Sequence, residues 1–154
     1  MRPLRAPDVV LLVSAIALLV VLSLDWFAGP PGASTTGWSS LGWLAVALVA
    51  GCALLGLVLV AMLATGVCDR VNLHVAVALA ALAPLAFIVL VLVVLLQPGL
   101  GLGLSNAAVE IRWPACAGIV AFAALTVAAW WSLHADGPVP LDRGGVEPEL
   151  RPAP

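Results

Sequence analysis

Long apolar runs, separated by short polar stretches, dominate the hydrophobic pattern of the chain. The runs cover residues 9–28, 43–65, 73–96 and 115–133. A helix needs about 20 mainly apolar residues to cross a bilayer. In lipid, a helix pairs all of its backbone groups within one such segment. The pattern therefore predicts an all-α protein, an integral membrane bundle of four transmembrane helices.

The first run is the shortest of the four. Its uninterrupted part, residues 9–24, would form a helix of about 24 Å at 1.5 Å per residue. That is less than the hydrocarbon core of about 30 Å. We expect Trp26, Phe27 and Ala28 to extend this helix, with both aromatic rings in an interfacial belt.

A cleaved signal peptide is the alternative interpretation of the first run. Arg2 and Arg5 resemble the positively charged start of such a peptide. However, Trp26 and Phe27 stand where a cleavage site needs small residues. The sequence therefore favours a retained first span.

Two prolines affect the helices predicted for the third and fourth runs. Pro84 lies within the run 73–96. It has no amide proton to bond the carbonyl of Ala80, so a helix kink is predicted there. Pro114 falls near the first turn of the fourth span, where the missing proton costs nothing.

Composition supports the membrane assignment. The chain is 64% hydrophobic and 9% charged, with a formal net charge of -2. Typical soluble domains are about 45–50% apolar and about 25% charged. So few charges cannot cover the surface of a soluble domain of this size. The composition therefore argues against a soluble enzyme, a disordered protein and a nucleic-acid-binding protein.

Arginine distribution predicts the orientation. With four spans, both termini lie on one side of the membrane, and that side carries five arginines: Arg2, Arg5, Arg70, Arg143 and Arg151. The other side carries only Arg112. Positive residues favour the cytoplasmic side. The absence of lysine, with abundant Ala, Gly, Val and Leu, suggests a GC-rich bacterial genome. We therefore expect a bacterial plasma membrane protein with cytoplasmic N- and C-termini.

The segments outside the spans differ in character. Residues 1–135 form the predicted transmembrane domain, and residues 136–154 are rich in proline and mixed charges. Such a composition predicts a disordered cytoplasmic tail. The outer segment 97–114 is apolar for a loop, and we expect a short interfacial helix over residues 105–113.

Tryptophans mark the first outer segment, residues 25–42, and its boundary with the second span. Trp26, Trp38 and Trp43 are candidates for a partner-facing surface. The alternative is simple aromatic anchoring at the membrane interface, where tryptophan is enriched. The sequence favours anchoring.

Small residues recur every four positions on the second span. Ala47 precedes Gly51, and Cys52 precedes Gly56, by four residues. Small residues at this spacing let two helix backbones approach closely. The candidate helix-packing seam therefore serves either internal packing, which we favour, or a homo-oligomer.

Candidate chemistry is sparse. Apart from Asp25 near the end of the first run, the four spans contain no Asp, Glu, Lys or Arg, which argues against a proton-coupled transporter, a voltage sensor or an intramembrane protease. The three cysteines form no C-x-x-C pair, so no redox or zinc motif is present. We predict no catalytic residue, cofactor or metal. A metal or haem site shared by His74 and His134, at the same end of the bundle, is the alternative.

Two short motifs suggest a resemblance. Residues 25–27 (Asp-Trp-Phe) close the first span, and residues 36–38 (Thr-Gly-Trp) follow in a Gly/Ser/Thr-rich segment. With three further spans and a Pro-rich tail, the chain resembles uncharacterised small four-span integral membrane proteins of actinobacterial type. The resemblance implies the membrane fold and no activity. The topology is also similar to that of claudins, but the paired loop cysteines of claudins are missing.

These observations favour a non-catalytic integral membrane protein, an accessory or scaffolding subunit of unknown pathway. The alternative is a small transporter or channel for an apolar or neutral solute. The expected partners are the lipid bilayer and either a membrane protein or a second copy of the chain. No nucleic acid partner is expected.

Overall fold

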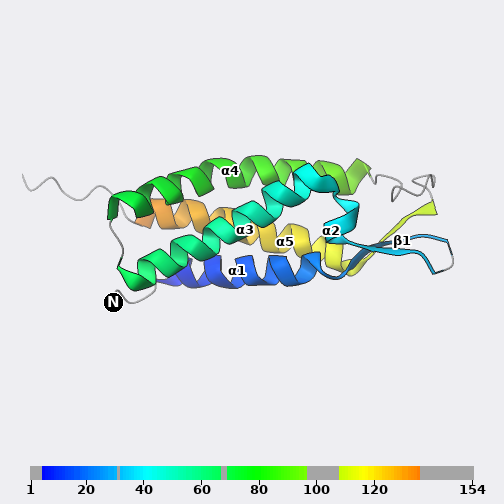
Figure 1. Cartoon of the computed structure of the whole chain (residues 1–154), viewed down its shortest axis with the longest axis horizontal. Coiled ribbons are helices and arrows are strands. Elements are labelled where there is room, and N and C mark those ends of the chain that lie inside the picture. Colours follow the sequence, from blue (N-terminus) through cyan, green and yellow to red (C-terminus); the bar gives the residue numbers. More distant parts are fainter. Residues whose placement is uncertain (1–4, 31, 67–68, 97–107, 136–154) are drawn as a thin grey trace, which may run out of the picture.

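The computed structural model describes residues 5–30, 32–66, 69–96 and 108–135. Within them, four long helices lie side by side (Figure 1), and shorter elements gather at one end of the bundle. The long helices are α1 (Ala6–Leu22), α3 (Gly42–Thr65), α4 (Asp69–Leu96) and α5 (Trp113–Ala135). The shorter elements are α2 (Gly37–Ser40), β1 (Asp25–Ala28), β2 (Ser34–Thr36) and β3 (Glu110–Ile111). The predicted tail lies outside the described residues.

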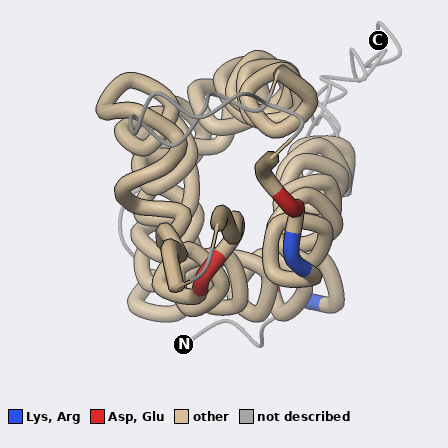
Figure 2. Tube along the Cα trace, turned by 90° about the vertical axis from the view of Figure 1, so that its right-hand side faces the viewer, with Lys and Arg blue, Asp and Glu red and all other residues tan. Residues whose placement is uncertain are grey.

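Each long helix packs against two neighbours. α1 contacts α3 and α5, and α4 contacts the same two helices. The end-on view in Figure 2 shows this square arrangement. Since successive helices run in opposite directions, the bundle is antiparallel. The predicted all-α class is confirmed.

Three of the described helices are long and apolar enough to cross a membrane, over Gly42–Thr65, Val71–Leu96 and Trp113–His134. α1, with 17 residues, is shorter. The ends of α3, α4 and α5 fall within about four residues of the sequence-based spans, an uncertainty usual for helix boundaries. α4 continues through Pro84 to Leu96.

The predicted extension of the first helix to residue 28 is wrong. α1 ends at Leu22, where the Ser23 amide donates to the Val20 carbonyl and the Leu24 amide donates to the Val21 carbonyl. These short-range bonds close the last helical turn. The next residues form β1 because neighbouring strands satisfy their backbone groups.

The three strands form one antiparallel sheet in the order β2–β1–β3. Phe27 of β1 is opposite Thr35 of β2 and Ile111 of β3. Part of the interfacial helix predicted over residues 105–113 is therefore a strand, and residues 105–107 lie outside the described part. The sheet joins the segment between α1 and α3 to the segment that precedes α5.

The bundle interior is apolar and closely packed. Its largest fully buried side chains include Trp26, Phe27, Phe122 and leucines of α1, α3, α4 and α5. Phe122 of α5 also contacts Phe87 of α4, with ring centroids 6.2 Å apart. Alanines fill the narrower parts of the core, which keeps the helices close together.

Candidate functional site

The indole ring of Trp26 lies between two glycines where the sheet meets the bundle. Trp26 is 0% exposed. A Cβ atom placed on Gly118 of α5 would lie 2.6 Å from Cζ2 and Cη2 of the ring, and one on Gly37 would lie 2.8 Å from Cε2. No ordinary contact is that short, so both positions need glycine. The backbones of α2 and α5 thus come directly against the ring.

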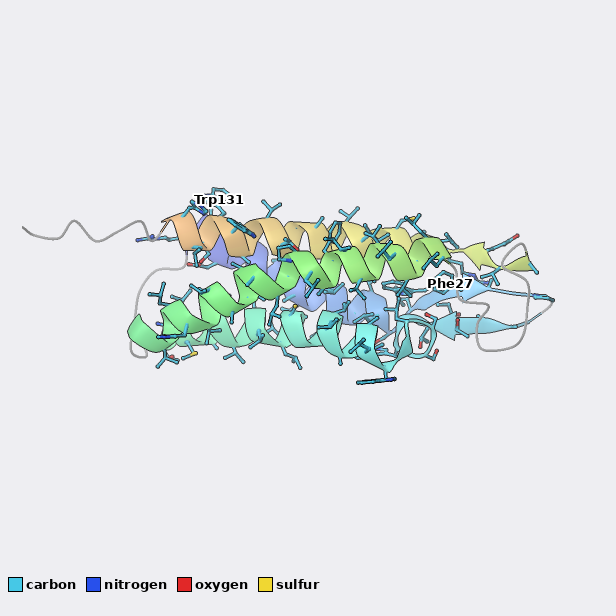
Figure 3. All side chains as sticks on the ribbon, turned by 90° about the horizontal axis from the view of Figure 1, so that it is seen from above. Phe27 and Trp131 are labelled. Carbon is cyan, nitrogen blue, oxygen red and sulfur yellow. The ribbon has the colours of Figure 1, made fainter. Side chains whose placement is uncertain are left out.

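The polar atoms of Trp26 join three segments of the chain. Its indole Nε1 donates to the carbonyl of Val21 at 2.7 Å, in the last turn of α1. Its own carbonyl accepts the amide of Arg112 at 2.8 Å, just after β3. Since helix ends leave carbonyls without intrahelical partners, the indole also helps to terminate α1. The neighbouring Phe27, labelled in Figure 3, is buried as well.

Trp38 has a different environment on the same end of the molecule. It is 41% exposed. Its Nε1 donates to Oγ of Ser23 at 3.1 Å, and that hydroxyl donates to the carbonyl of Leu19 at 3.3 Å. One edge of the indole is therefore fixed to the end of α1. The rest of the ring remains available to a partner. We call β1, β2, β3 and α2 the cap.

An ion pair connects β1 of the cap to the residue that follows β3. Arg112 Nη1 lies 3.7 Å from Asp25 Oδ2, and both side chains are about half exposed. Figure 2 looks onto this end of the bundle. An exposed pair at this distance contributes little to stability. The pair is accordingly a minor part of the cap.

The three tryptophans predicted as one surface therefore occupy three environments. Trp26 is in the core, Trp38 is on the cap, and Trp43 is 82% exposed on the side of α3. Sequence reasoning missed Gly118 and gave Trp113 no role, although Trp113 is also highly exposed at the start of α5. A glycine inside an apolar helix was the available signal, since such a residue often marks close backbone approach.

The candidate packing seam divides between two faces of α3. Cys52 is buried, and a Cβ on Gly56 would lie 3.5 Å from Leu11 Cδ1 of α1, an ordinary contact. Ala47 is exposed, and a Cβ on Gly51 would meet nothing within 4 Å. The structure thus places Cys52 and Gly56 within the bundle. Ala47 and Gly51 lie on its outer side.

The two histidines lie at the end opposite the cap. His134 Nδ1 is 2.8 Å from the carbonyl of Trp130, and its ring stacks on that indole with centroids 5.8 Å apart. His74 is exposed near the start of α4. The described residues contain no group of three or more His, Cys, Asp or Glu side chains suited to a metal. The geometry of His134 is therefore explained by contacts within its own helix.

The cap is the most distinctive feature of the described residues. Searches against protein families, curated proteins and solved structures gave no match. The cap offers a fixed, partly polar surface with one half-exposed indole, Trp38, which suits binding to another protein.

Proposed function

We propose that the chain is a four-span protein of the bacterial plasma membrane that acts as a non-catalytic accessory or scaffolding subunit. The observation that carries this proposal is the cap. It is a folded surface attached to one end of an apolar bundle, with Trp38 half exposed on it. Tryptophan is among the residues that contribute most to protein interfaces. In this proposal the cap binds a membrane protein partner.

The distribution of arginine supports an outward-facing cap. Arg112 directly follows β3 of the cap, whereas Arg5 precedes α1 and Arg70 lies in the first turn of α4, both at the other end. Arg2 comes three residues before Arg5 in the sequence. Positive residues favour the cytoplasmic side. The proposed orientation therefore places the cap outside the cell and both termini in the cytoplasm.

The bundle interior favours a scaffold over a path for solute through one copy. Leu11, Leu18, Leu79, Leu90 and Leu125 are fully buried along the helices. A close-packed apolar interior leaves no room for a hydrated route. The described packing therefore supports the accessory role more than the transporter or channel alternative.

The first experiment is to purify the tagged full chain from its native membrane in mild detergent and identify co-purifying proteins by mass spectrometry. We expect a stoichiometric membrane protein. Trp38→Ala should greatly reduce its recovery, because the variant removes the exposed indole from the cap. Trp43→Ala is the matched control, since it removes an exposed tryptophan from the side of α3.

Two outcomes would contradict the proposal. One is equal recovery of the partner with both variants, which would place the binding surface elsewhere. The other is purification of the chain alone, combined with solute flux in reconstituted vesicles above that of empty vesicles. That combination would favour the transporter or channel alternative. Circular dichroism of each variant checks that the bundle is still helical.

A further inference from the structure

The exposed tryptophans form two groups at opposite ends of the bundle. Trp43 and Trp113 lie at the starts of α3 and α5, next to the cap. Trp130 and Trp131 lie at the end of α5, and Figure 3 labels Trp131 at the end opposite Phe27. We call these the cap-side and far-side tryptophans. Tryptophan is enriched at both membrane–water interfaces because its ring is apolar and its N–H is polar.

The distance between the groups can be measured along α5. Trp113 and Trp131 are both in this helix, and at 1.5 Å per residue they are about 27 Å apart along its axis. The residues between them include no charged side chain. Val120 and Val127, which lie between the two groups, are among the most exposed side chains of the helix. The exposed face of α5 is therefore an apolar band with tryptophan at each end.

The length of α1 gives a second, independent measure of the height of the apolar band. This helix has 17 residues, which correspond to about 26 Å, and its one charged residue, Asp8 in the first turn, is buried and accepts the Arg5 amide at 2.9 Å. Val13, Ile16 and Val20 are exposed along it. The polar residues Arg5 and Ser23 flank the helix at its two ends. Two adjacent helices of different sequence therefore define apolar bands of nearly equal height.

The apolar runs of α3 and α4, at about 36 Å each, are longer than this height, so these two helices must incline or extend beyond the band. α3 has 24 residues and α4 has 28. Figure 1 shows α3 inclined to α1, and an inclined helix fits more residues within the same thickness. The first residues of α4 include Asp69, Arg70 and Asn72. Those polar positions extend the helix beyond the apolar band.

We infer that the bundle is matched to a phospholipid bilayer with a hydrocarbon core of about 26 Å, thinner than the typical core of about 30 Å. Trp43 and Trp113 lie at the outer headgroup level, and Trp130 and Trp131 lie at the inner one. The cap stands outside the lipid. This inference rests on the membrane location given under the proposed function, and it adds the lipid-facing surface and its depth.

Fluorescence quenching in phosphatidylcholine vesicles tests the depth. One set of vesicles carries bromine close to the headgroup, and the other carries it close to the end of the acyl chain. We expect stronger quenching of the full-length protein by the shallow bromine. Trp113→Phe should remove part of that quenching, and the double variant Trp130→Phe/Trp131→Phe should remove a further part. Trp26→Phe should leave the quenched intensity unchanged, because Trp26 is buried.

Stronger quenching by the deep bromine would overturn the inference. So would shallow quenching that is undiminished in both the Trp113 and the Trp130/Trp131 variants, since only Trp43 of the four exposed tryptophans next to the headgroups is unchanged there. If Trp26→Phe fails to fold, as shown by circular dichroism in the same vesicles, the comparison among the remaining variants still decides the depth.

Bilayer thickness provides the second measurement. The full chain is reconstituted in phosphatidylcholines of increasing monounsaturated chain length, and its thermal unfolding is followed. We expect the highest midpoint in the bilayers with a core near 26 Å and lower midpoints in thicker ones, because mismatch costs free energy. A highest midpoint at or above about 30 Å would overturn the inference. Failure to insert into any vesicle would instead contradict the membrane location, and neither result depends on the partner experiment.

Discussion

At the cap, the tryptophan indole of Trp26 is buried and joins α1, α2 and α5, whereas at the far side Trp130 and Trp131 are about half exposed on one helix. Trp26 donates its N–H to Val21. The carbonyl of Trp130 is 2.8 Å from His134 of the same helix. Tryptophan therefore connects separate elements at the cap, whereas at the far side it lies on the surface of a single helix.

The backbone around the ring explains this difference. Trp26 can enter the bundle because Gly37 and Gly118 leave space where any side chain would collide with it. The far-side tryptophans occupy the outer face of α5, where lipid is the expected neighbour. Burial of a large aromatic thus depends on small residues in distant segments. Substitutions at the cap should consequently affect the whole fold, and those at the far side should not.

The largest expected effect comes from Trp26→Ala. The substitution leaves a cavity and removes the hydrogen bond to Val21, so we expect the free energy of unfolding to fall by about 3–5 kcal/mol. Titration of the full chain with a denaturing detergent, followed by circular dichroism, measures this loss. Trp131→Ala is the matched control, with an expected loss of about 0.5 kcal/mol or less. Equal losses for the two variants would remove the contrast between the ends.

Gly118→Ala tests the space around the ring. The added Cβ would lie 2.6 Å from Trp26, and overpacking of this kind costs about 1–3 kcal/mol. Gly51→Ala is the control because its Cβ would meet nothing within 4 Å. Alanine is the better helix former by up to about 1 kcal/mol, so Gly51→Ala should be neutral or stabilising. Similar unfolding curves for both variants would show that the ring has room to move.

Much of the bundle is predictable from sequence because one requirement governs it. Backbone groups in an apolar environment must be paired locally, so each long apolar run predicts a helix. α3, α4 and α5 follow these runs closely. Charged residues and glycines near the ends of the runs indicate where the helices begin and end. Gly66, for example, closes α3 with a φ of 70°.

The cap is not predictable in the same way because its pairing is non-local. Trp26, Phe27 and Ala28 are apolar, so they are indistinguishable from the end of a helical run. β1 pairs with β3, whose residues Glu110 and Ile111 lie far along the chain. The β-branched Thr35 and Thr36, a few residues after the sequence Pro-Pro-Gly, were the local signal for a hairpin.

The candidate site shows the same limit at the level of single residues. Trp26, Trp38 and Trp43 are equivalent as letters in a sequence, and their spacing does not indicate which one is buried. Which tryptophan is buried depends on Gly118, which contacts Trp26 in the fold but lies far from it in the sequence. Exposure of Trp38 likewise depends on Ser23, which fixes one edge of its indole.

A smaller effect is expected from Trp38→Phe. The variant keeps an aromatic ring on the cap but removes the hydrogen bond to Ser23. The loss of one such bond costs about 0.5–1.5 kcal/mol, which the same detergent titration measures. Ser39→Ala is the comparison on the same short helix, because it removes the hydrogen bonds of Ser39 to Thr36 and leaves the indole bond intact. A loss as large as that of Trp26→Ala would mean that the half-exposed indole, and not the buried one, stabilises the cap.

The smallest effect belongs to the ion pair between Asp25 and Arg112. Both groups are about half exposed, so Asp25→Asn and Arg112→Gln should each change the free energy of unfolding by about 0–1 kcal/mol. The Arg112 amide still donates to the Trp26 carbonyl in both variants, because that bond uses the backbone. A double-mutant cycle, repeated at about 1 M salt, isolates the charge interaction, which salt should screen. A coupling above about 2 kcal/mol that persists in salt would show that charge holds the cap together, and the contrast drawn from Trp26 would then fail.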